Sequence, residues 1–477
     1  MHTLATAFAG RTLRCVLLAG ACAVATTAAG EDGLHTDPGT IAVDPIFADL
    51  DGTHSPGCAL GVYRRGEIAL LRGWGMGSLE HGVPIDGDTV FYAGSVSKQF
   101  TAAAVLLAAR EGHLSLEDPI RRWFPELPAW AEPIRVDHLL HHTSGLRDYL
   151  TLMALAGVPF ETPVEPAWIL DLVARQEAAN FAPGTEYLYS NTGYFLLGRL
   201  VERATGQSLA AWSEAHVFAP LGMTATRFHD DRTAIVERRA LAYARSDTGA
   251  LEVRWSPAFD HVGGGGLLTT ARDLARWDAS FHDGSLGETF WTTLTETTRL
   301  ADGTDLDYAH GVRVDRVGGH RRIQHGGAMF GYRAQLSRFP DAGLTVAVLC
   351  NVADADPQAR ARSVAGLYLP GADTAPDAEE ADETAEADTT PLPADPTAWI
   401  GRFESTELGA LARIERVGDA LHHRVGLAPA TPLAFHPDGS ADLPRGRATP
   451  KFDDDGRVVA FVVDAGRVRG IRFRRTP

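Results

Sequence analysis

A serine and a lysine stand three residues apart at Ser95 and Lys98, just after Gly94 and ahead of a long apolar run. Of the 44 basic residues in the chain, only Lys98 and Lys451 are lysine. Arginine cannot replace a lysine that must lose or share a proton, because its guanidinium stays charged at any working pH. A lysine amine can be brought toward neutrality by burial and can then activate a neighbouring hydroxyl. The pair therefore indicates proton chemistry on a serine.

The residues that follow Lys98 predict a buried helix. Gln99 to Arg110 are strong helix formers and are apolar nearly all round. Ser95 and Lys98 would share one face of the first turn, where free backbone N–H groups can meet an oxyanion. Ser-x-x-Lys alone is a weak pattern, and a capping serine beside a solvated lysine is the simpler alternative.

Two later segments carry polar groups that suit the same chemistry. Tyr189-Ser190-Asn191 follows a loop rich in proline and glycine and precedes a predicted helix. His325-Gly326-Gly327-Ala328 lies at a predicted strand edge, ahead of an alternating hairpin that runs to Cys350.

With these motifs in this order, the chain resembles the serine β-lactamase and penicillin-binding-protein superfamily. The nearer match is its class C-like branch, which includes D-alanyl-D-alanine carboxypeptidases, D-aminopeptidases and lipolytic esterases. The resemblance covers roughly residues 45–365, and His142-Thr-Ser-Gly-Leu146 matches as well. It implies an α/β (α+β) fold, in which an antiparallel sheet formed from both chain ends is flanked by helices and a helical region is inserted between them. The reactive serine would lie at the seam of these parts, and we expect no cofactor.

The resemblance also implies roles for individual residues. Ser95 would be the nucleophile that forms an acyl-enzyme, Lys98 would share its proton, and Tyr189 would act with Lys98 as general base and later protonate the leaving group. Tyr187 could compete with Tyr189, but its partner at i+2 is Tyr189 and not asparagine. The backbone N–H groups of Ser95 and Ala328 would form the oxyanion hole. The implied substrate-binding positions are Asn191, His325, Gly326, Gly327 and Ala328.

His325 departs from the pattern, because typical β-lactamases and penicillin-binding proteins carry a lysine at this position. A mostly neutral imidazole holds a carboxylate less firmly than an ammonium, which disfavours efficient β-lactam hydrolysis and strict carboxypeptidase specificity. With a reference pKa of about 6.5, His325 is expected to gain charge in mildly acidic solution. Arg333 could bind a carboxylate instead, although a surface arginine is the simpler interpretation.

Other clusters have simpler interpretations. His141 and His142 resemble a metal-binding pair, but neighbours on a helix point apart and no His-Glu-x-x-His or cysteine partner follows. We therefore expect no metal site. Gly263 to Gly266 lacks the residues that complete a phosphate loop, and predicts instead a flexible loop into a helix capped by Thr270 and Asp273. The resemblance places this loop near the reactive serine.

The first residues of the chain predict a secretory signal at 1–29, with Arg11 and Arg14 ahead of an apolar run that ends in small residues. A lipoprotein site at Cys22 is disfavoured, because Ala19 stands where leucine is usual. No other stretch approaches the ~18 apolar residues that span a bilayer. We therefore expect a secreted or periplasmic protein without a transmembrane span in its mature chain.

The two cysteines beyond this signal are Cys58 and Cys350, each in a strand-like run. In the resembled family the first and last strands are neighbours, so an oxidising compartment would allow these cysteines to pair. Two buried free thiols are an equal alternative.

Charge marks the domain boundaries. Between Gly371 and Asp395 there are nine acidic residues and no basic ones, which predicts a disordered linker at 371–396. It separates a hydrolase domain at 30–370 from a small antiparallel β domain at 397–477, which resembles the lipocalin-like domains of some family members and shows no catalytic constellation. Neither half has the basic surface that nucleic-acid binding needs, and the net charge is −17.

Three functions fit these observations. The first is a serine hydrolase that forms acyl-enzymes from D-amino-acid peptides or related amides, with weak β-lactamase activity. The second is an esterase on small acyl esters, and the third is a non-catalytic binding protein. The intact Ser95, Lys98, Tyr189 and Asn191 argue against the third. The shape of the pocket, which motifs do not report, separates the first two. In either case the partner is a small-molecule or peptide substrate, and the oligomeric state stays open.

Overall fold

The structure is a computed structural model that describes residues 43–254, 260–373 and 396–477. The predicted signal at 1–29, the position Cys22 and most of the predicted acidic linker lie outside the described residues. Contacts join the described residues into one compact unit.

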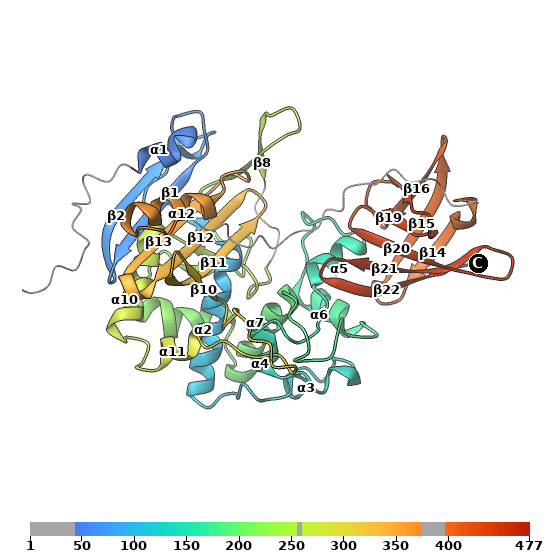
Figure 1. Cartoon of the computed structure of the whole chain (residues 1–477), viewed down its shortest axis with the longest axis horizontal. Helices are drawn as coiled ribbons and strands as arrows, with labels where there is room; N and C mark the ends of the chain where they lie inside the picture. Colours follow the sequence, from blue (N-terminus) through green and yellow to red (C-terminus); the bar gives the residue numbers. More distant parts are fainter. Residues whose placement is uncertain (1–42, 255–259, 374–395) are drawn as a thin grey trace, which may run out of the picture. The chain divides into compact units, whose positions relative to one another are not determined.

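The central element is a six-stranded antiparallel sheet formed from both ends of the catalytic region (Figure 1). Its strands, in spatial order, are β10 (Arg313–Val317), β11 (His320–Met329), β12 (Tyr332–Phe339), β13 (Leu344–Cys350), β1 (Cys58–Arg64) and β2 (Glu67–Trp74). Every residue of β13 is buried, because helices as well as neighbouring strands contact it. A strand buried at each residue needs cover on both faces of the sheet.

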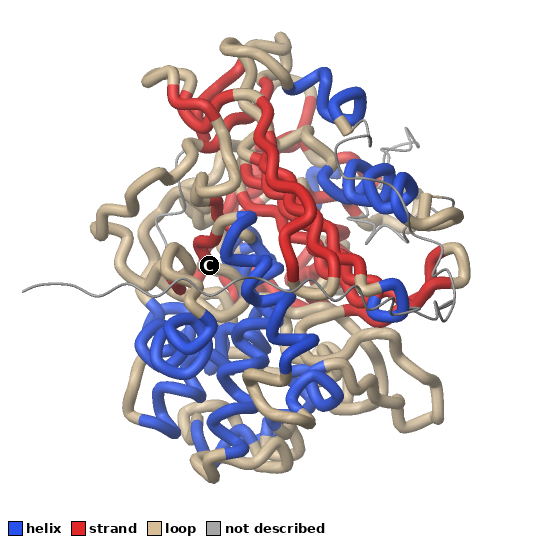
Figure 2. The backbone as a smooth tube through the Cα atoms, turned by 90° about the vertical axis from the view of Figure 1, so that its left-hand side faces the viewer, coloured by secondary structure: helices blue, strands red, loops and turns tan. Residues whose placement is uncertain are grey.

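Helices fill most of the region between β2 and β10, and in Figure 2 most of them gather below the strands. Those in this region are α2 (Ser97–Arg110), α3 (Ile120–Trp123), α4 (Val136–Leu140), α5 (Tyr149–Leu155), α6 (Pro166–Ala174), α7 (Asn191–Thr205), α8 (Leu209–Ser213), α9 (Ala219–Leu221), α10 (Ala271–Asp283) and α11 (Phe290–Leu294). Two more lie outside it, α1 (Asp44–Phe47) before β1 and α12 (Pro357–Tyr368) after β13. No helix within the described residues is both long and apolar enough to cross a membrane.

The helix predicted after the serine and lysine is α2. Its residues from Ser97 to Ala108 are all buried, which explains why the sequence is apolar on every side. It packs against α7, α8 and α11, so the first turn of α2 lies inside the domain. The cap predicted at Thr270 is confirmed, since the Thr270 hydroxyl accepts the N–H of Asp273 at the start of α10. The capping role predicted for the Asp273 side chain is wrong, because this carboxylate accepts from the Ala225 N–H and the Thr226 hydroxyl.

Short strands surround these elements. They are β3 (Met76–Ser78), β4 (Val83–Pro84), β5 (Phe91–Tyr92), β6 (Arg227–Phe228), β7 (Ala242–Arg245), β8 (Leu251–Arg254) and β9 (Leu267–Thr269). The residues from Leu79 to Ile85 alternate as a longer strand would, but only β4 forms there. Gly82, at φ +63°, makes a turn here, and Pro84 has no N–H to extend a ladder.

The C-terminal region is all-β, as the alternating runs predict. Nine antiparallel strands form one sheet in the order β17-β16-β15-β14-β22-β21-β20-β19-β18. Their bounds are β14 (Gly401–Ser405), β15 (Ala410–Val417), β16 (Ala420–Val425), β17 (Thr431–Pro432), β18 (Ala434–Phe435), β19 (Ala441–Leu443), β20 (Gly446–Phe452), β21 (Val458–Ala465) and β22 (Val468–Arg475). A buried aromatic cluster of Trp399, Phe403, Phe461 and Phe473 forms its core.

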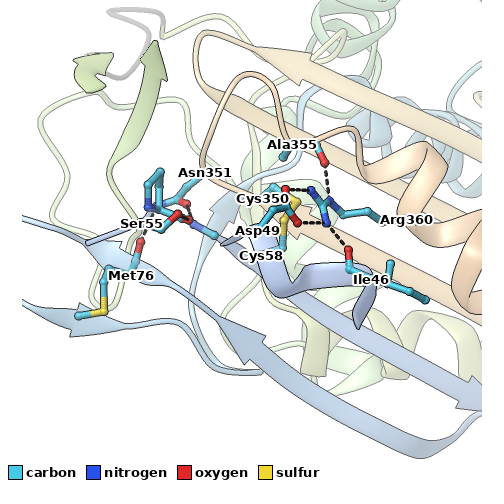
Figure 3. The surroundings of a disulfide bond; sticks show 11 residues. Ile46, Asp49, Ser55, Cys58, Met76, Cys350, Asn351, Ala355 and Arg360 are labelled. Atoms are coloured by element: carbon cyan, nitrogen blue, oxygen red, sulfur yellow. Dashed lines mark hydrogen bonds and ion pairs between the residues drawn. A yellow bond between two sulfur atoms is a disulfide. The ribbon is translucent and has the colours of Figure 1, made fainter. Parts of the chain in front are cut away.

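Cys58 and Cys350 form a disulfide that joins β1 to β13 (Figure 3). These strands are the first and last of the six-stranded sheet in chain order and are neighbours within it. The two residues are direct partners in the register of β1 and β13, and both are fully buried. Beside them, the guanidinium of Arg360 pairs with Asp49. Of the two alternatives left open by the sequence, the structure therefore has the disulfide.

Replacing both cysteines with alanine is expected to lower the free energy of unfolding by about 2–5 kcal/mol. The bond closes a loop of sequence separation 292, and a long closed loop restricts the unfolded chain strongly. Denaturant unfolding of the wild type and of the Cys58→Ala/Cys350→Ala variant without reductant measures the difference. Dithiothreitol should then destabilise the wild type alone, and a wild type indifferent to reductant would show that the thiols are free.

Candidate active site

Ser95 lies in a short 3-10 turn, η3 (Gly94–Val96), that leads directly into α2. Lys98 follows in the first turn of α2, and its Nζ is 3.1 Å from the Ser95 Oγ. Lys98 is fully buried, so the alternative of a solvated lysine is wrong. The spacing of three residues places the two side chains together because they share a helix face.

Lys98 has two further partners that can only accept hydrogen bonds. Its Nζ donates to the Oδ1 of Asn191 at 3.0 Å and to the carbonyl oxygen of Gly264 at 2.7 Å. A neutral amine has two N–H bonds and one lone pair, so with both bonds donated the lone pair faces the Ser95 hydroxyl. An ammonium would direct its third N–H to the same oxygen. One proton can therefore pass between the serine and the lysine without any rearrangement.

The orientation of Asn191 is fixed by a buried carboxylate. Its Nδ2 and its backbone N–H both donate to the Oδ2 of Asp148, at 2.9 and 2.7 Å. The other oxygen of Asp148 accepts the N–H of Thr151 and caps α5. Because Asp148 takes the amide nitrogen of Asn191, the amide oxygen is the atom that faces Lys98.

Tyr189 lies over the same lysine in a cluster of rings. The Lys98 Nζ is 4.6 Å from the centre of the Tyr189 ring. The centres of the Tyr189 and His142 rings are 4.3 Å apart. The Nδ1 of His142 accepts the backbone N–H of Ser190 at 3.1 Å, and burial lowers the pKa of His142 well below its usual value. A neutral His142 therefore supports the backbone that carries Tyr189. The guanidinium of Arg467, in the turn between β21 and β22, lies 4.6 Å from the Tyr189 ring centre.

The edge of β11 lies against the turn that carries the serine. β10 pairs with β11 only as far as Gln324. From His325 onward, this edge of β11 has no pairing with β10. Gly94 has φ +53°, and a Cβ at this position would lie 2.6 Å from the Ala328 nitrogen. A Cβ on Gly327 would in turn lie 3.1 Å from the Ser95 nitrogen. The two glycines thus bring the backbone nitrogens of Ser95 and Ala328 close together, as an oxyanion hole needs.

Both ring nitrogens of His325 have partners. Its Nδ1 lies 2.6 Å from the carbonyl oxygen of Gly326, and its Nε2 lies 3.0 Å from the hydroxyl of Tyr308. Burial, aided by the charge of Lys98, lowers the pKa of His325 to about 3. A carbonyl can only accept, so Nδ1 carries the proton and Nε2 accepts from Tyr308. The expected gain of charge in mildly acidic solution is therefore wrong, and the ring has no N–H left to offer a carboxylate.

These groups line one cavity of about 1010 Å³. The predicted positions that line it are Ser95, Tyr189, Asn191, His325, Gly326, Gly327 and Ala328. Tyr187 is not among its described lining residues, and the Tyr187 hydroxyl accepts instead from Arg313. Arg333 does line the cavity, with a guanidinium nitrogen donating to the carbonyls of Phe330 and Tyr332, so its interpretation as a surface arginine is wrong.

Sequence reasoning missed three residues of this site. Asp148 has only the local signal of a helix cap, and Tyr308 follows no motif. Arg467 lies in a domain in which the sequence shows no catalytic constellation. The loop at Gly264, by contrast, lies where the family resemblance places it, because its carbonyl binds Lys98.

A serine held against a buried lysine, at the seam of an antiparallel sheet and a helical region, defines a serine hydrolase of the β-lactamase and penicillin-binding-protein fold. A sequence profile of the Beta-lactamase family matches residues 43–369, and the chain belongs to this family. The resemblance drawn from the three motifs is thereby confirmed.

Two kinds of relative are similar to this chain. A D-aminopeptidase of Brucella canis is 28% identical over 383 residues, which are 78% of this chain and 68% of the relative. A D-amino acid amidase from Ochrobactrum anthropi SV3, solved with L-phenylalanine amide, is 25% identical with a TM-score of 0.57, covering 69% of this chain and 99% of that one. An octameric penicillin-binding protein homologue from Pyrococcus abyssi shares the fold, with 22% identity, a TM-score of 0.60, and coverage of 88% and 95%.

Proposed function

We propose that this chain hydrolyses amides of D-amino acids, including D-amino-acid peptides whose scissile bond does not lie next to a free carboxylate, through an acyl-enzyme on Ser95. The observation that carries the proposal is the neutral His325. Its N–H donates to the carbonyl of Gly326, and its other ring nitrogen accepts from the hydroxyl of Tyr308. A substrate whose scissile bond lies next to a free carboxylate finds no cation at this position. A D-aminoacyl amide needs none, which agrees with the names of the aminopeptidase and amidase relatives.

The reaction follows from the contacts of the serine. As the Ser95 Oγ attacks the substrate carbonyl carbon, its proton passes to the lone pair of Lys98. The oxygen that becomes negative accepts hydrogen bonds from the N–H groups of Ser95 and Ala328. The carbon–nitrogen bond then breaks, and the proton goes through Tyr189 to the leaving amine. Water then gives a proton to the same base and attacks the ester carbon, the carbon–oxygen bond to Ser95 breaks, and the proton returns to the Ser95 Oγ as the acid leaves.

Paired substrates test this proposal. Purified protein is assayed with D- and L-phenylalanine amide, a matched D-phenylalanine ester, a D-alanyl-D-alanine peptide and a chromogenic cephalosporin. The D-amide is expected to exceed the L-amide by about 10-fold or more in kcat/KM. The peptide and the cephalosporin, which both carry carboxylates, should be poor substrates. Turnover of the ester alone would make the protein an esterase, and absence of both turnover and an acyl-enzyme mass would make it a binding protein.

His325→Lys is expected to raise turnover of the cephalosporin relative to the ester by about 10-fold or more, because a charged hydrogen bond to a carboxylate contributes about 1.5–3 kcal/mol. His325→Gln, of similar size and without charge, should give no such rise. In the wild type the ratio of the two rates should stay flat from pH 5.5 to 8, since His325, with a pKa of about 3, is neutral throughout. A ratio that rises toward pH 5.5 would show that His325 titrates and binds the carboxylate.

We further propose that the protein works outside the cytoplasm, secreted or in the periplasm. The predicted signal at 1–29 and the disulfide of Cys58 and Cys350 both support this location. Cell fractionation, together with the intact mass of the purified chain, tests this location. An uncleaved protein in the cytoplasmic fraction would contradict it.

A further inference from the structure

Three side chains with metal-ligating atoms meet away from the active-site cavity. Asp137 and His141 lie on and just after α4, one helical turn apart, and His310 comes from the segment before β10. One atom of each, the Asp137 Oδ1, the His141 Nδ1 and the His310 Nε2, lies within 4.8 Å of the other two. None of the three residues is among the described residues that line the cavity, and the proposed reaction does not use them.

The separations of these atoms fit one small cation. The His141 Nδ1 is 3.1 Å from the Asp137 Oδ1, and the His310 Nε2 is 3.7 Å from the same oxygen. Zinc bonds of about 2.0–2.1 Å in tetrahedral geometry place neighbouring ligand atoms about 3.3 Å apart. These two distances lie on either side of this value, and the third, between the two histidine nitrogens, is no more than 4.8 Å, so the three atoms can converge on one ion.

The other nitrogen of each histidine determines which atom faces the cluster. The Nδ1 of His310 lies 2.7 Å from the carbonyl oxygen of Thr293, and the Nε2 of His141 lies 3.3 Å from that of Glu296. His310 must donate its N–H to the Thr293 carbonyl, which leaves the lone pair of its Nε2 toward Asp137. The His141 Nδ1 lies 3.2 Å from the Asp137 carbonyl oxygen as well as 3.1 Å from its carboxylate, so that this nitrogen and the two Asp137 oxygens face the same point. Zinc-binding histidines commonly have this arrangement, with the second nitrogen donating to a backbone carbonyl.

A proton satisfies this cluster less completely than a metal ion does. Placed on the His141 Nδ1, it would bridge to Asp137, and that carboxylate does raise the pKa of His141 against the effect of burial. The His310 Nε2 would still lack a partner, because 3.7 Å is too long for a hydrogen bond. Within the described part of the chain this buried nitrogen makes no hydrogen bond, although His310 is only 3% exposed.

We propose that Asp137, His141 and His310 bind a zinc ion, with water as the fourth ligand. The Asp137 side chain is 31% exposed, which gives the ion and a water access from solvent. From the sequence, His141 and His142 resemble a metal-binding pair only superficially, and no metal site is expected there. The fold instead turns His142 toward Tyr189 and brings His310 to His141, with ring centres 4.5 Å apart.

The ion would join α4 to the segment that leads into β10, beside two residues that support the active site. His142, next to His141, packs on Tyr189, and Tyr308, two residues before His310, binds His325. We therefore assign the zinc ion a structural role, independent of which substrate the enzyme hydrolyses.

Metal content of the untagged full-length protein tests the proposal. The wild type is dialysed against zinc and then against metal-free buffer. Inductively coupled plasma mass spectrometry should then find about one zinc per chain. Asp137→Asn and His310→Gln should weaken zinc binding by at least ~100-fold, more than loss of a supporting contact costs. The matched control is His113→Gln, which removes a half-exposed histidine near Glu111 and should retain the zinc. A wild type without zinc, or variants that bind it as the wild type does, would overturn the site.

Two measurements on the wild type alone do not depend on the folding of the variants. Added zinc should raise the Tm of chelator-treated protein by about 5 °C or more, whereas magnesium and calcium should not. Cobalt added in place of zinc should give the visible absorption of a four-coordinate site. A Tm indifferent to zinc, or equally raised by magnesium, would overturn the proposal.

Discussion

Ser95→Ala is expected to lower kcat/KM on every substrate by at least ~10⁴-fold, because removal of a serine nucleophile leaves only binding and oxyanion stabilisation. The acyl-enzyme mass and labelling by a fluorescent serine-hydrolase probe should disappear together. The fold should persist, since the Ser95 hydroxyl makes one contact to Lys98 and the turn is held by its backbone. Initial rates, intact-protein mass and near-ultraviolet circular dichroism measure the three effects.

The neighbouring serine is the matched control. Ser97 is fully buried, and its hydroxyl donates to the Gly94 carbonyl at 2.5 Å and accepts the Leu267 N–H at 3.1 Å. Ser97→Ala should therefore lower stability by about 1–3 kcal/mol, as expected for an orphaned buried N–H, and keep its probe labelling. Labelling that is lost in Ser97→Ala and kept in Ser95→Ala would reverse the assignment.

The sequence predicts most of what lies on one helix turn or within one motif. Ser95 and Lys98 meet because a spacing of three on a helix leaves little choice. Asn191 begins a helix and His325 begins the free edge of a strand, both as the sequence predicts. That these three segments converge could be inferred only from the family resemblance, because each contact spans a long stretch of chain.

The groups that position these residues could not be predicted in the same way. Asp148 looks like an ordinary helix cap, and only the fold shows that its second oxygen orients Asn191. Tyr308 decides the tautomer of His325, yet nothing in its local sequence indicates that it lies near the histidine. The charge state of His325 could not be predicted from the sequence either. Burial and the nearby Lys98 determine its pKa, and a sequence motif reports neither of them.

Arg467, in the C-terminal β region, is a further residue of the site that could not be predicted from the sequence. The alternating runs correctly predict the strands on either side of it, but not that their turn reaches the catalytic residues. Its carbonyl accepts the Asn180 side chain, and its guanidinium lies over Tyr189 in the wall of the cavity. Contacts of this kind depend on how two segments far apart in the sequence fit together, which composition and periodicity do not encode.

Lys98→Arg is expected to be nearly as inactive as Lys98→Ala, with each at least ~10²-fold below the wild type in kcat/KM. The amine has a lone pair for the Ser95 proton only because Asn191 and Gly264 take its other two positions. A guanidinium keeps its charge and has no such lone pair, so it can satisfy the acceptors but cannot take the proton. Rates on the D-amide, with single-turnover measurement of the acyl-enzyme mass, show whether formation of the acyl-enzyme is the step that fails.

The chain offers a matched control in its one other lysine. Lys451 is exposed on β20, so Lys451→Arg makes the same chemical change where no proton transfer depends on it, and its rate should equal that of the wild type. Lys98→Ala separates the two roles of the buried amine, because it removes the charge as well as the base. If Lys98→Arg keeps a near-normal rate while Lys98→Ala loses it, then Lys98 acts as a fixed positive charge. The proton of Ser95 would in that case pass to Tyr189, which lines the cavity and whose ring centre lies 4.6 Å from the Lys98 Nζ.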